Sequence, residues 1–357
     1  TELCLLPEVK LVVCGSAASW MIKNIVRATG GLHNRLTHKI ALKPFKLAEV
    51  KELLLSNGID YSAKHLIETY MALGGVPYYI SLIEKGESPT QALSRLCAQS
   101  GPLRDEFSQL FKALFNEWEN HEEIVKALAS KRRGLTRPQL SERTGIAAGG
   151  RLSKFLQELE EAGFITQIPA FVGTKHERAF RIIDCFALFH LKWIAPSGTG
   201  VLSMEQNDFI LKQDSQEFSV WSGFAFENVI FQHVTEIKKC LGISSIQTNI
   251  FTWETPKERK TTMGKPSQRG AQIDLVLDRG DGTVSICEIK YYDQKFSIDK
   301  TYADNLRNKV ARFREMMGNE KTTMLVIISA SGLVQNEYAK QLISSSINAN
   351  DLIQPIF

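Results

Sequence analysis

Apolar and polar positions follow two different periods along this chain. Apolar residues at helical spacing predict helices over about 48–56, 62–84 and 103–130. Beyond residue 218, short and mostly apolar runs typical of buried strands are mixed with helical stretches. The expected order there is helix 222–240, strands 245–253, 271–278 and 283–291, helix 301–317, strand 323–329 and helix 336–345. These patterns predict an α/β protein with more than one domain.

A third pattern fills residues 121–184. Three short helices are expected at 122–130, 137–144 and 150–162, followed by strands at 164–171 and 178–183. Thr136 and Gly145 are typical helix-capping residues on either side of the second helix. Three helices and a β-ribbon in this order predict a winged helix-turn-helix.

The strongest chemical signal is a hairpin with charged positions in apolar strands. Asp281-Gly282 is a hairpin turn signal, and a turn centred on Asp281 places Asp274 opposite Glu288. Lys290 then shares a face with Glu288, because side chains alternate along a strand. Two carboxylates on one face would repel, and a divalent cation bound by their oxygens removes that repulsion. Glu227, on the preceding helix, is a further acid available to such a site.

Residues 218–346 resemble the PD-(D/E)XK nuclease superfamily. The resemblance rests on the leading helix with Glu227, on Asp274, on Glu288-x-Lys290, on a helix containing Lys309 and Phe313, and on the hydrophobic strand after it. The resemblance implies a restriction-endonuclease-like α/β domain that hydrolyses DNA with Mg²⁺ or Mn²⁺. It implies that Asp274 and Glu288 bind the metal with help from the Ile289 carbonyl, that Lys290 is the catalytic lysine and that Glu227 is an auxiliary acid. Ile273 stands where many members have proline. A solvated hairpin with surface ion pairs, or a nuclease-like scaffold without activity, are the alternatives.

Two basic stretches make DNA the expected partner. Residues 126–154 contain eight Lys or Arg and one Glu, a surplus of +7 in a chain whose net charge is +4. Such a surplus on a helix-turn-helix indicates phosphate binding, while a protein-binding module or a solvated face is the alternative. A second stretch precedes the Asp274 strand. The candidate DNA-binding residues are Arg132, Arg133, Arg137, Arg151, Lys154, Lys260, Lys265 and Arg269.

The N-terminal third resembles the second half of an AAA-type P-loop ATPase of the archaeal-type (DEXX-box) family. The resemblance rests on the apolar run 10–14 with Ser16, on Arg35 and on the segment Gly74-Gly75-Val76-Pro77-Tyr78-Tyr79. It implies a partial ATPase sheet, a helical lid and self-association through the ATPase part, with Ser16 and Arg35 near nucleotide. The chain contains no G-x-x-x-x-G-K-[ST] motif, so ATP is expected only in a longer parent protein.

The composition excludes several classes of protein and agrees with the elements predicted above. The chain has 357 residues, 43% hydrophobic and 23% charged, which excludes a disordered, collagenous or coiled-coil architecture. Its six scattered cysteines fit a reducing cytoplasm, and no apolar run is long enough for a membrane span. The expected divisions are 1–46 (ATPase remnant), 47–120 (helical lid), 121–184 (winged helix), 185–217 (linker) and 218–357 (nuclease-like domain). The expected function is DNA cleavage. Two alternatives are a DNA-binding regulatory ATPase whose last domain is a scaffold, and a plain winged-helix transcription regulator.

Overall fold

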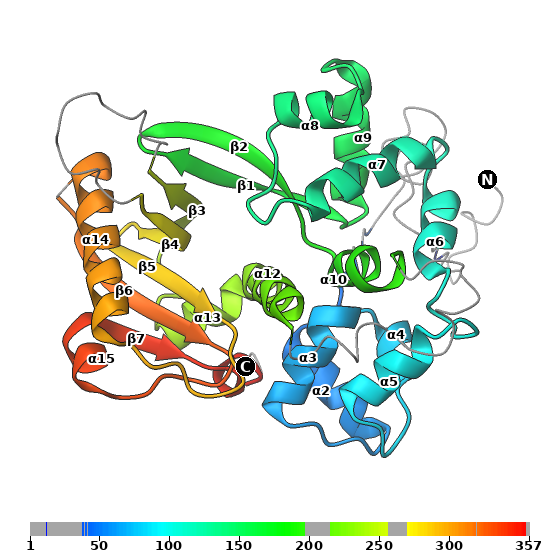
Figure 1. Cartoon of the computed structure of the whole chain (residues 1–357), viewed down its shortest axis with the longest axis horizontal. Helices are drawn as coiled ribbons and strands as arrows, with labels where there is room; N and C mark the ends of the chain where they lie inside the picture. The colour runs from blue at the N-terminus through cyan, green and yellow to red at the C-terminus, as the bar shows by residue number, and fades with distance from the viewer. Residues whose placement is uncertain are drawn as a thin grey trace, which may run out of the picture.

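One mixed sheet of seven strands organises the part of the chain that the computed structural model describes, residues 12, 38, 40, 42–196, 215–255, 270–318 and 320–354. Its strand order is β2-β1-β3-β4-β5-β6-β7 (Figure 1). The strands are β1 Ile165–Val172, β2 Lys175–Ile182, β3 Thr248–Glu254, β4 Gln272–Arg279, β5 Thr283–Lys290, β6 Thr322–Ser329 and β7 Ile343–Ile347. Fourteen α-helices accompany the sheet within these residues, so the predicted α/β class is confirmed.

The helices expected near 48–56 and 62–84 are present, and the second is interrupted at Gly74 and Gly75. The four helices are α2 Leu47–Ser56, α3 Ala63–Leu73, α4 Pro77–Ser81 and α5 Pro89–Leu96. The Phe45 backbone N–H donates to the Gly75 carbonyl at 2.7 Å. A Cβ at Gly75 would lie 1.9 Å from the Phe45 carbonyl oxygen, so this close approach requires glycine. Most of the expected ATPase remnant, 1–46, lies outside the described residues.

Three helices and an antiparallel hairpin follow in the order expected for 121–184. After α6 Glu106–Leu114 come α7 Trp118–Ala129, α8 Arg137–Thr144 and α9 Gly150–Glu161, and then β1 and β2. The Thr136 N–H donates to the Gln139 side chain at 2.9 Å at the start of α8. Gly145 ends the same helix at φ 70°, in the left-handed region that favours glycine. Local capping chemistry therefore sets the bounds of α8.

The hairpin belongs to the same sheet as the C-terminal strands. β1 pairs in parallel with β3, with Ala170 opposite Thr252 and Phe171 opposite Trp253. The segments 121–184 and 218–357, expected as separate domains, therefore share one sheet. They are linked along the chain by α10 Cys185–Phe189 and the π-helix η3 His190–Ile194.

The β4–β5 hairpin has the register that its turn predicts. Leu275 pairs with Cys287 and Val276 with Ile286. Continued by one pair, this register places Asp274 opposite Glu288. β5 then pairs in parallel with β6, which makes β5 a central strand.

Helices cover both faces of the C-terminal strands (Figure 1). The helix α14 Lys300–Met317 packs on one face, where Leu306 and Phe313 join Ile286 in an apolar core. On the other face lies α12 Gln216–Gln232, and Phe226 and Cys287 belong to a second core there. The remaining helices are α13 Val234–Cys240, α15 Glu337–Leu342 and α16 Ala349–Leu352.

One expected helix, 336–345, is wrong in its second half. α15 ends at Leu342, and Ile343–Ile347 form β7, parallel to β6. The segment contains three consecutive serines, which are weak helix formers, and the edge of β6 supplies partners for its backbone. Within the described residues, no helix has the length and apolar character needed to cross a membrane.

Candidate active site

Glu288 lies near the end of β5 and is fully buried. Its Oε1 accepts a hydrogen bond from Lys309 Nζ at 2.6 Å, and its Oε2 accepts one from the Tyr302 hydroxyl at 3.0 Å. Lys290 Nζ lies 3.5 Å from the same Oε2, which confirms that the two side chains share a face. Tyr302 and Lys309 both come from α14, seven residues apart and therefore on one side of that helix.

Burial raises the pKa of Glu288, and the neighbouring negative charge of Asp274 raises it further. Lys309 and Lys290 act in the opposite direction by favouring the ionised carboxylate. Burial, followed by the charge of Glu288, also raises the pKa of Tyr302, so Tyr302 remains a hydroxyl donor at ordinary pH. Two lysines and one tyrosine thus hold a carboxylate in the middle of the sheet.

Asp274 lies on β4, the strand that pairs with the Glu288 strand in the hairpin. Its side chain is 8% exposed, and its Oδ2 accepts a hydrogen bond from the Ile289 backbone N–H at 3.1 Å. The bond ties β4 to the residue that follows Glu288. The predicted approach of the two acids and Lys290 is therefore present in the fold.

Glu227 comes from α12 and lies between two arginines. Its Oε2 accepts from Arg181 at 3.0 Å, and its Oε1 is paired with Arg132. The Arg181 guanidinium is centred 5.0 Å from the Phe224 ring and 4.7 Å from the Phe231 ring. Both oxygens of Glu227 are engaged by arginine in this arrangement.

The two arginines differ in surroundings. Arg181 is 4% exposed, and burial lowers its pKa, which Glu227 counteracts. Arg132 is 44% exposed. Burial opposes its charge, but the hydrogen bond that Arg132 donates to Glu227, together with the negative charges of Glu227, Asp274 and Glu288, outweighs this and raises the pKa of Arg132. Arg132 therefore lies in the combined field of all three acids.

Cationic side chains pair with Glu227 and Glu288, and a backbone N–H donates to Asp274. No three His, Cys, Asp or Glu side chains in the described part of the chain are arranged to hold a metal ion. Comparisons with protein-family models, with curated proteins and with solved structures found no match.

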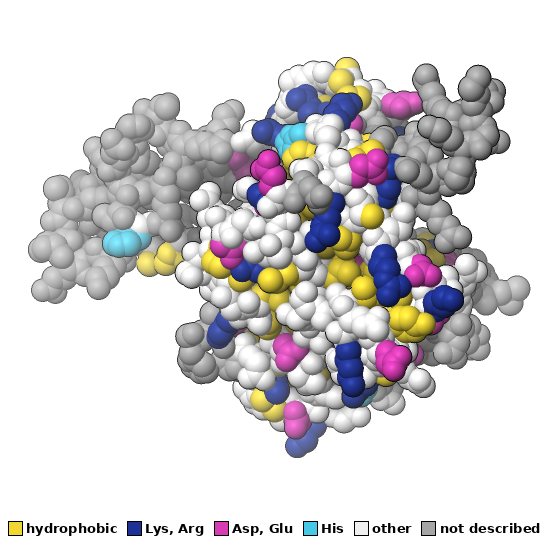
Figure 2. All heavy atoms as spheres, turned by 90° about the vertical axis from the view of Figure 1, so that its left-hand side faces the viewer, with side chains coloured by type: hydrophobic (Ala, Val, Ile, Leu, Met, Phe, Trp, Pro, Cys, Tyr) yellow, Lys and Arg dark blue, Asp and Glu magenta, His cyan; other side chains and the backbone are white. Residues whose placement is uncertain are grey.

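The basic residues expected to bind DNA are distributed over three places. Arg133 pairs with Glu254 and Gln272 beside the carboxylates. Arg151 and Lys154, on α9, pair with Glu117 at 2.7 and 3.3 Å and remain more than half exposed. The surplus of +7 is thus partly balanced by acids from other segments. On the face drawn in Figure 2, Lys and Arg side chains are scattered among Asp and Glu.

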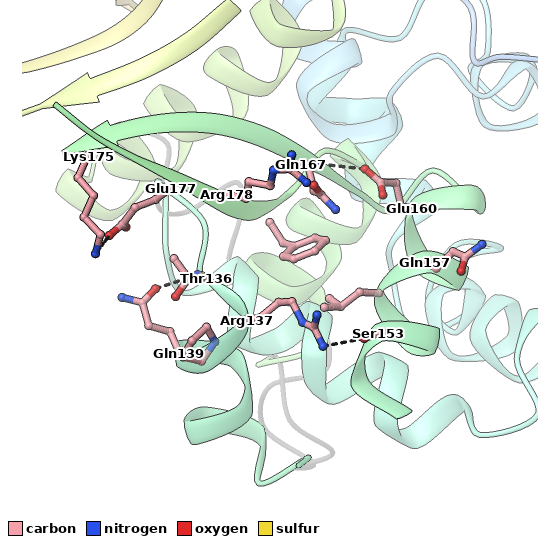
Figure 3. Close-up of a pocket in the computed structure, with 13 residues that line it drawn as sticks. Thr136, Arg137, Gln139, Ser153, Gln157, Glu160, Gln167, Lys175, Glu177 and Arg178 are labelled. Carbon is pink, nitrogen blue, oxygen red and sulfur yellow. Dashed lines mark hydrogen bonds and ion pairs between the residues drawn. The ribbon is translucent and has the colours of Figure 1, made fainter. Parts of the chain in front are cut away.

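Arg137 lines a groove between α8, α9 and the β1–β2 hairpin (Figure 3). Its guanidinium donates to Ser153 Oγ at 2.6 Å. Lys175 and Arg178 line the same groove from β2, and both are exposed. The groove has a volume of about 750 Å³ and also contains the acids Glu160 and Glu177.

Five expected site residues, Ser16, Arg35, Lys260, Lys265 and Arg269, lie outside the described residues. The sequence pointed to Lys309 only as a residue of the helix that follows the Glu288 strand, and it did not point to Tyr302 or Arg181. Tyr302 could have been found, since it lies two helical turns from Lys309 on the same helix. Arg181 had no such signal, because nothing local connects β2 to Glu227.

Proposed function

We propose that this chain hydrolyses phosphodiester bonds of DNA in a metal-dependent reaction at Asp274, Glu288 and Lys290. The observation that carries the proposal is the complete burial of Glu288 beside Lys290 and opposite Asp274. Burying a carboxylate next to a second one costs free energy, and such arrangements concentrate at functional sites. The order α12, β3, β4, β5, α14, β6 supports the resemblance of 218–346 to PD-(D/E)XK nucleases.

The donor set suits a hard divalent cation. Asp274 and Glu288 supply carboxylate oxygens, which Mg²⁺ and Mn²⁺ prefer, and the resemblance adds the Ile289 carbonyl. When bound, such an ion would polarise a phosphoryl oxygen and lower the pKa of a bound water.

The chain's own residues have separable roles in this proposal. Lys290, 21% exposed, would donate to an oxygen of the scissile phosphate and stabilise the charge that develops there. Tyr302 and Lys309 would orient the Glu288 carboxylate, because they engage one oxygen each. Glu227 would hold Arg132 and Arg181 in place and would not be a metal ligand, because both of its oxygens already accept hydrogen bonds from arginine.

The three helices and hairpin would bind the DNA backbone as a winged helix. Arg151 and Lys154 are exposed, and surface ion pairs such as theirs with Glu117 are weak enough to exchange for phosphate. Arg137, Lys175 and Arg178 would contact phosphates along the groove of Figure 3. Attachment to an ATPase, and self-association through it, remain proposals from the resemblance of the N-terminal third.

A second candidate is a DNA-binding regulatory protein whose C-terminal part is a scaffold. The observation in its favour is that each of the three acids already has a partner within the chain: Glu227 has arginines, Glu288 has lysines and a tyrosine, and Asp274 has a backbone N–H. A scaffold needs no metal.

Cleavage of plasmid and branched DNA with Mg²⁺ or Mn²⁺ tests the proposal. The wild type is compared with Asp274→Asn and Lys290→Met. Asp278→Asn is a matched control, because Asp278 is on the same strand, about 13 Å away, and pairs with Lys321. We expect cleavage by the wild type and the control, and its loss in the two site variants. Equal cleavage by all four proteins, or DNA binding without cleavage by any, would contradict the nuclease proposal, and the second result would favour the scaffold.

A further inference from the structure

The loop between α7 and α8 carries Arg132 to the carboxylates and is fixed to the sheet next to it. Leu135 exchanges two backbone hydrogen bonds with Phe180 of β2, both at 2.9 Å. Gly134 has φ 77°, and a Cβ there would lie 2.2 Å from the Phe180 carbonyl oxygen. The loop therefore has a defined position, with Arg132 three residues before its contact with β2.

Positive side chains already outnumber negative ones in the group of charges around Arg132. Four carboxylates, from Glu227, Asp274, Glu288 and Glu254, are accompanied by five cationic side chains, from Arg132, Arg133, Arg181, Lys290 and Lys309. The net charge of this group is +1. A divalent cation entering it would raise that charge to +3 in a largely buried place, where charges are weakly screened. Binding is favoured only if one of the side-chain cations withdraws.

Arg132 is the cation best able to withdraw. Among the cations that pair with Glu227 or Glu288, its side chain is the most exposed, at 44% against 4% for Arg181, 21% for Lys290 and 13% for Lys309. Arg133, 53% exposed on the same loop, pairs with Glu254 and with neither of these acids. Arg132 stands on a loop, whereas Arg181, Lys290 and Lys309 are on β2, β5 and α14. Its departure would leave Glu227 still paired with Arg181.

We propose that Arg132 is an internal counter-ion that closes the carboxylate site, and that a divalent cation binds to Asp274 and Glu288 only when the loop carrying Arg132 moves away. The inference rests on the proposed nuclease function and adds a mode of regulation to it. Because this loop leads directly into α8, DNA that moves the three-helix unit would open the metal site. Nuclease activity would then depend on where the winged helix is docked.

The test is Mn²⁺ binding to the whole chain, measured by the electron paramagnetic resonance signal of free Mn²⁺, without DNA. The wild type is compared with Arg132→Gln, with Asp274→Asn and with the double variant. Lys131→Gln is the matched control, because it removes the same charge from the same loop, and Lys131 is exposed and makes no ion pair found among the described residues. Thermal melting establishes that each variant is folded.

We expect Arg132→Gln to bind Mn²⁺ at least about tenfold more tightly than the wild type, because a unit charge close to the ion is removed. Lys131→Gln should bind as the wild type does, and both Asp274→Asn proteins should not bind. Equal or weaker binding by Arg132→Gln, with binding still lost in Asp274→Asn, would overturn the inference and leave the nuclease proposal standing. No binding by any protein would overturn both.

Hydrogen exchange gives a second readout that does not depend on affinity. Saturating Mn²⁺ should raise the exchange of backbone amides at 131–135 in the wild type, since the loop must leave β2. The same addition should have no effect on Asp274→Asn. Unchanged protection of this loop in wild-type protein with Mn²⁺ bound would overturn the inference.

Discussion

The stability of a variant in which Glu227 is neutralised shows whether this residue has a structural or a catalytic role. Glu227 is 3% exposed, and its partner Arg181 is 4% exposed, so the variant Glu227→Gln leaves a buried guanidinium without a counter-charge. Breaking a buried ion pair by removing one partner costs about 3–5 kcal/mol. The pair with Arg132 adds at most about 1 kcal/mol, because that side chain is 44% exposed and its charge is screened. We expect the free energy of unfolding to fall by about 3–5 kcal/mol.

A double-mutant cycle shows whether the loss comes from the Glu227–Arg181 pair. Arg181→Met keeps apolar contact with Phe224 and Phe231 while removing the charge. The double variant should be more stable than the sum of the two single losses predicts, by about 2 kcal/mol or more. Urea unfolding followed by tryptophan fluorescence measures this, since Trp221 is buried on the same helix. A loss below about 1 kcal/mol in Glu227→Gln would refute the structural role and favour the auxiliary catalytic acid.

Three further predictions concern stability. Burial lowers the pKa of His233 to about 4, so between pH 6.5 and 4 the unfolded chain binds more protons than the folded one and the folded state loses stability as the pH falls. Between pH 7 and 5 the free energy of unfolding of the wild type should therefore fall by about 2 kcal/mol more than that of His233→Gln. Urea unfolding at both pH values measures the difference. Gly134→Ala should lower the melting temperature more than Gly145→Ala, since both have positive φ but only Gly134 would also meet a backbone oxygen; equal shifts would contradict this close contact. Tyr302→Phe should cost about 1–2 kcal/mol in unfolding free energy, because Oε2 of buried Glu288 loses its hydroxyl donor and keeps only the longer contact with Lys290. An unchanged value would mean that the hydrogen bond is replaced.

Sequence-local rules predicted most elements and the core of the candidate site. The helix bounds of α8 followed from Thr136 and Gly145, and the interruption after α3 followed from its paired glycines. The approach of Asp274 to Glu288 followed from counting outward from one turn. Three expectations were wrong in part. The expected helices 103–130 and 222–240 are each divided in two, between Leu114 and Trp118 and at His233. The segment of β7 was expected as helix, but a serine-rich segment has little preference of its own and takes the structure that a neighbouring strand edge offers.

The sequence by itself determined which residues alternate, which turns are tight and which carboxylates meet across a hairpin, because these depend on backbone geometry over a few residues. Only the tertiary structure decided which charges pair. Arg132 was expected on a DNA-binding surface, and the fold places it on Glu227, 95 residues away along the chain. The pairing of β1 with β3 likewise joins two segments that local patterns present as separate. Contacts of this kind depend on how distant segments pack, and burial then makes the charge pairing obligatory.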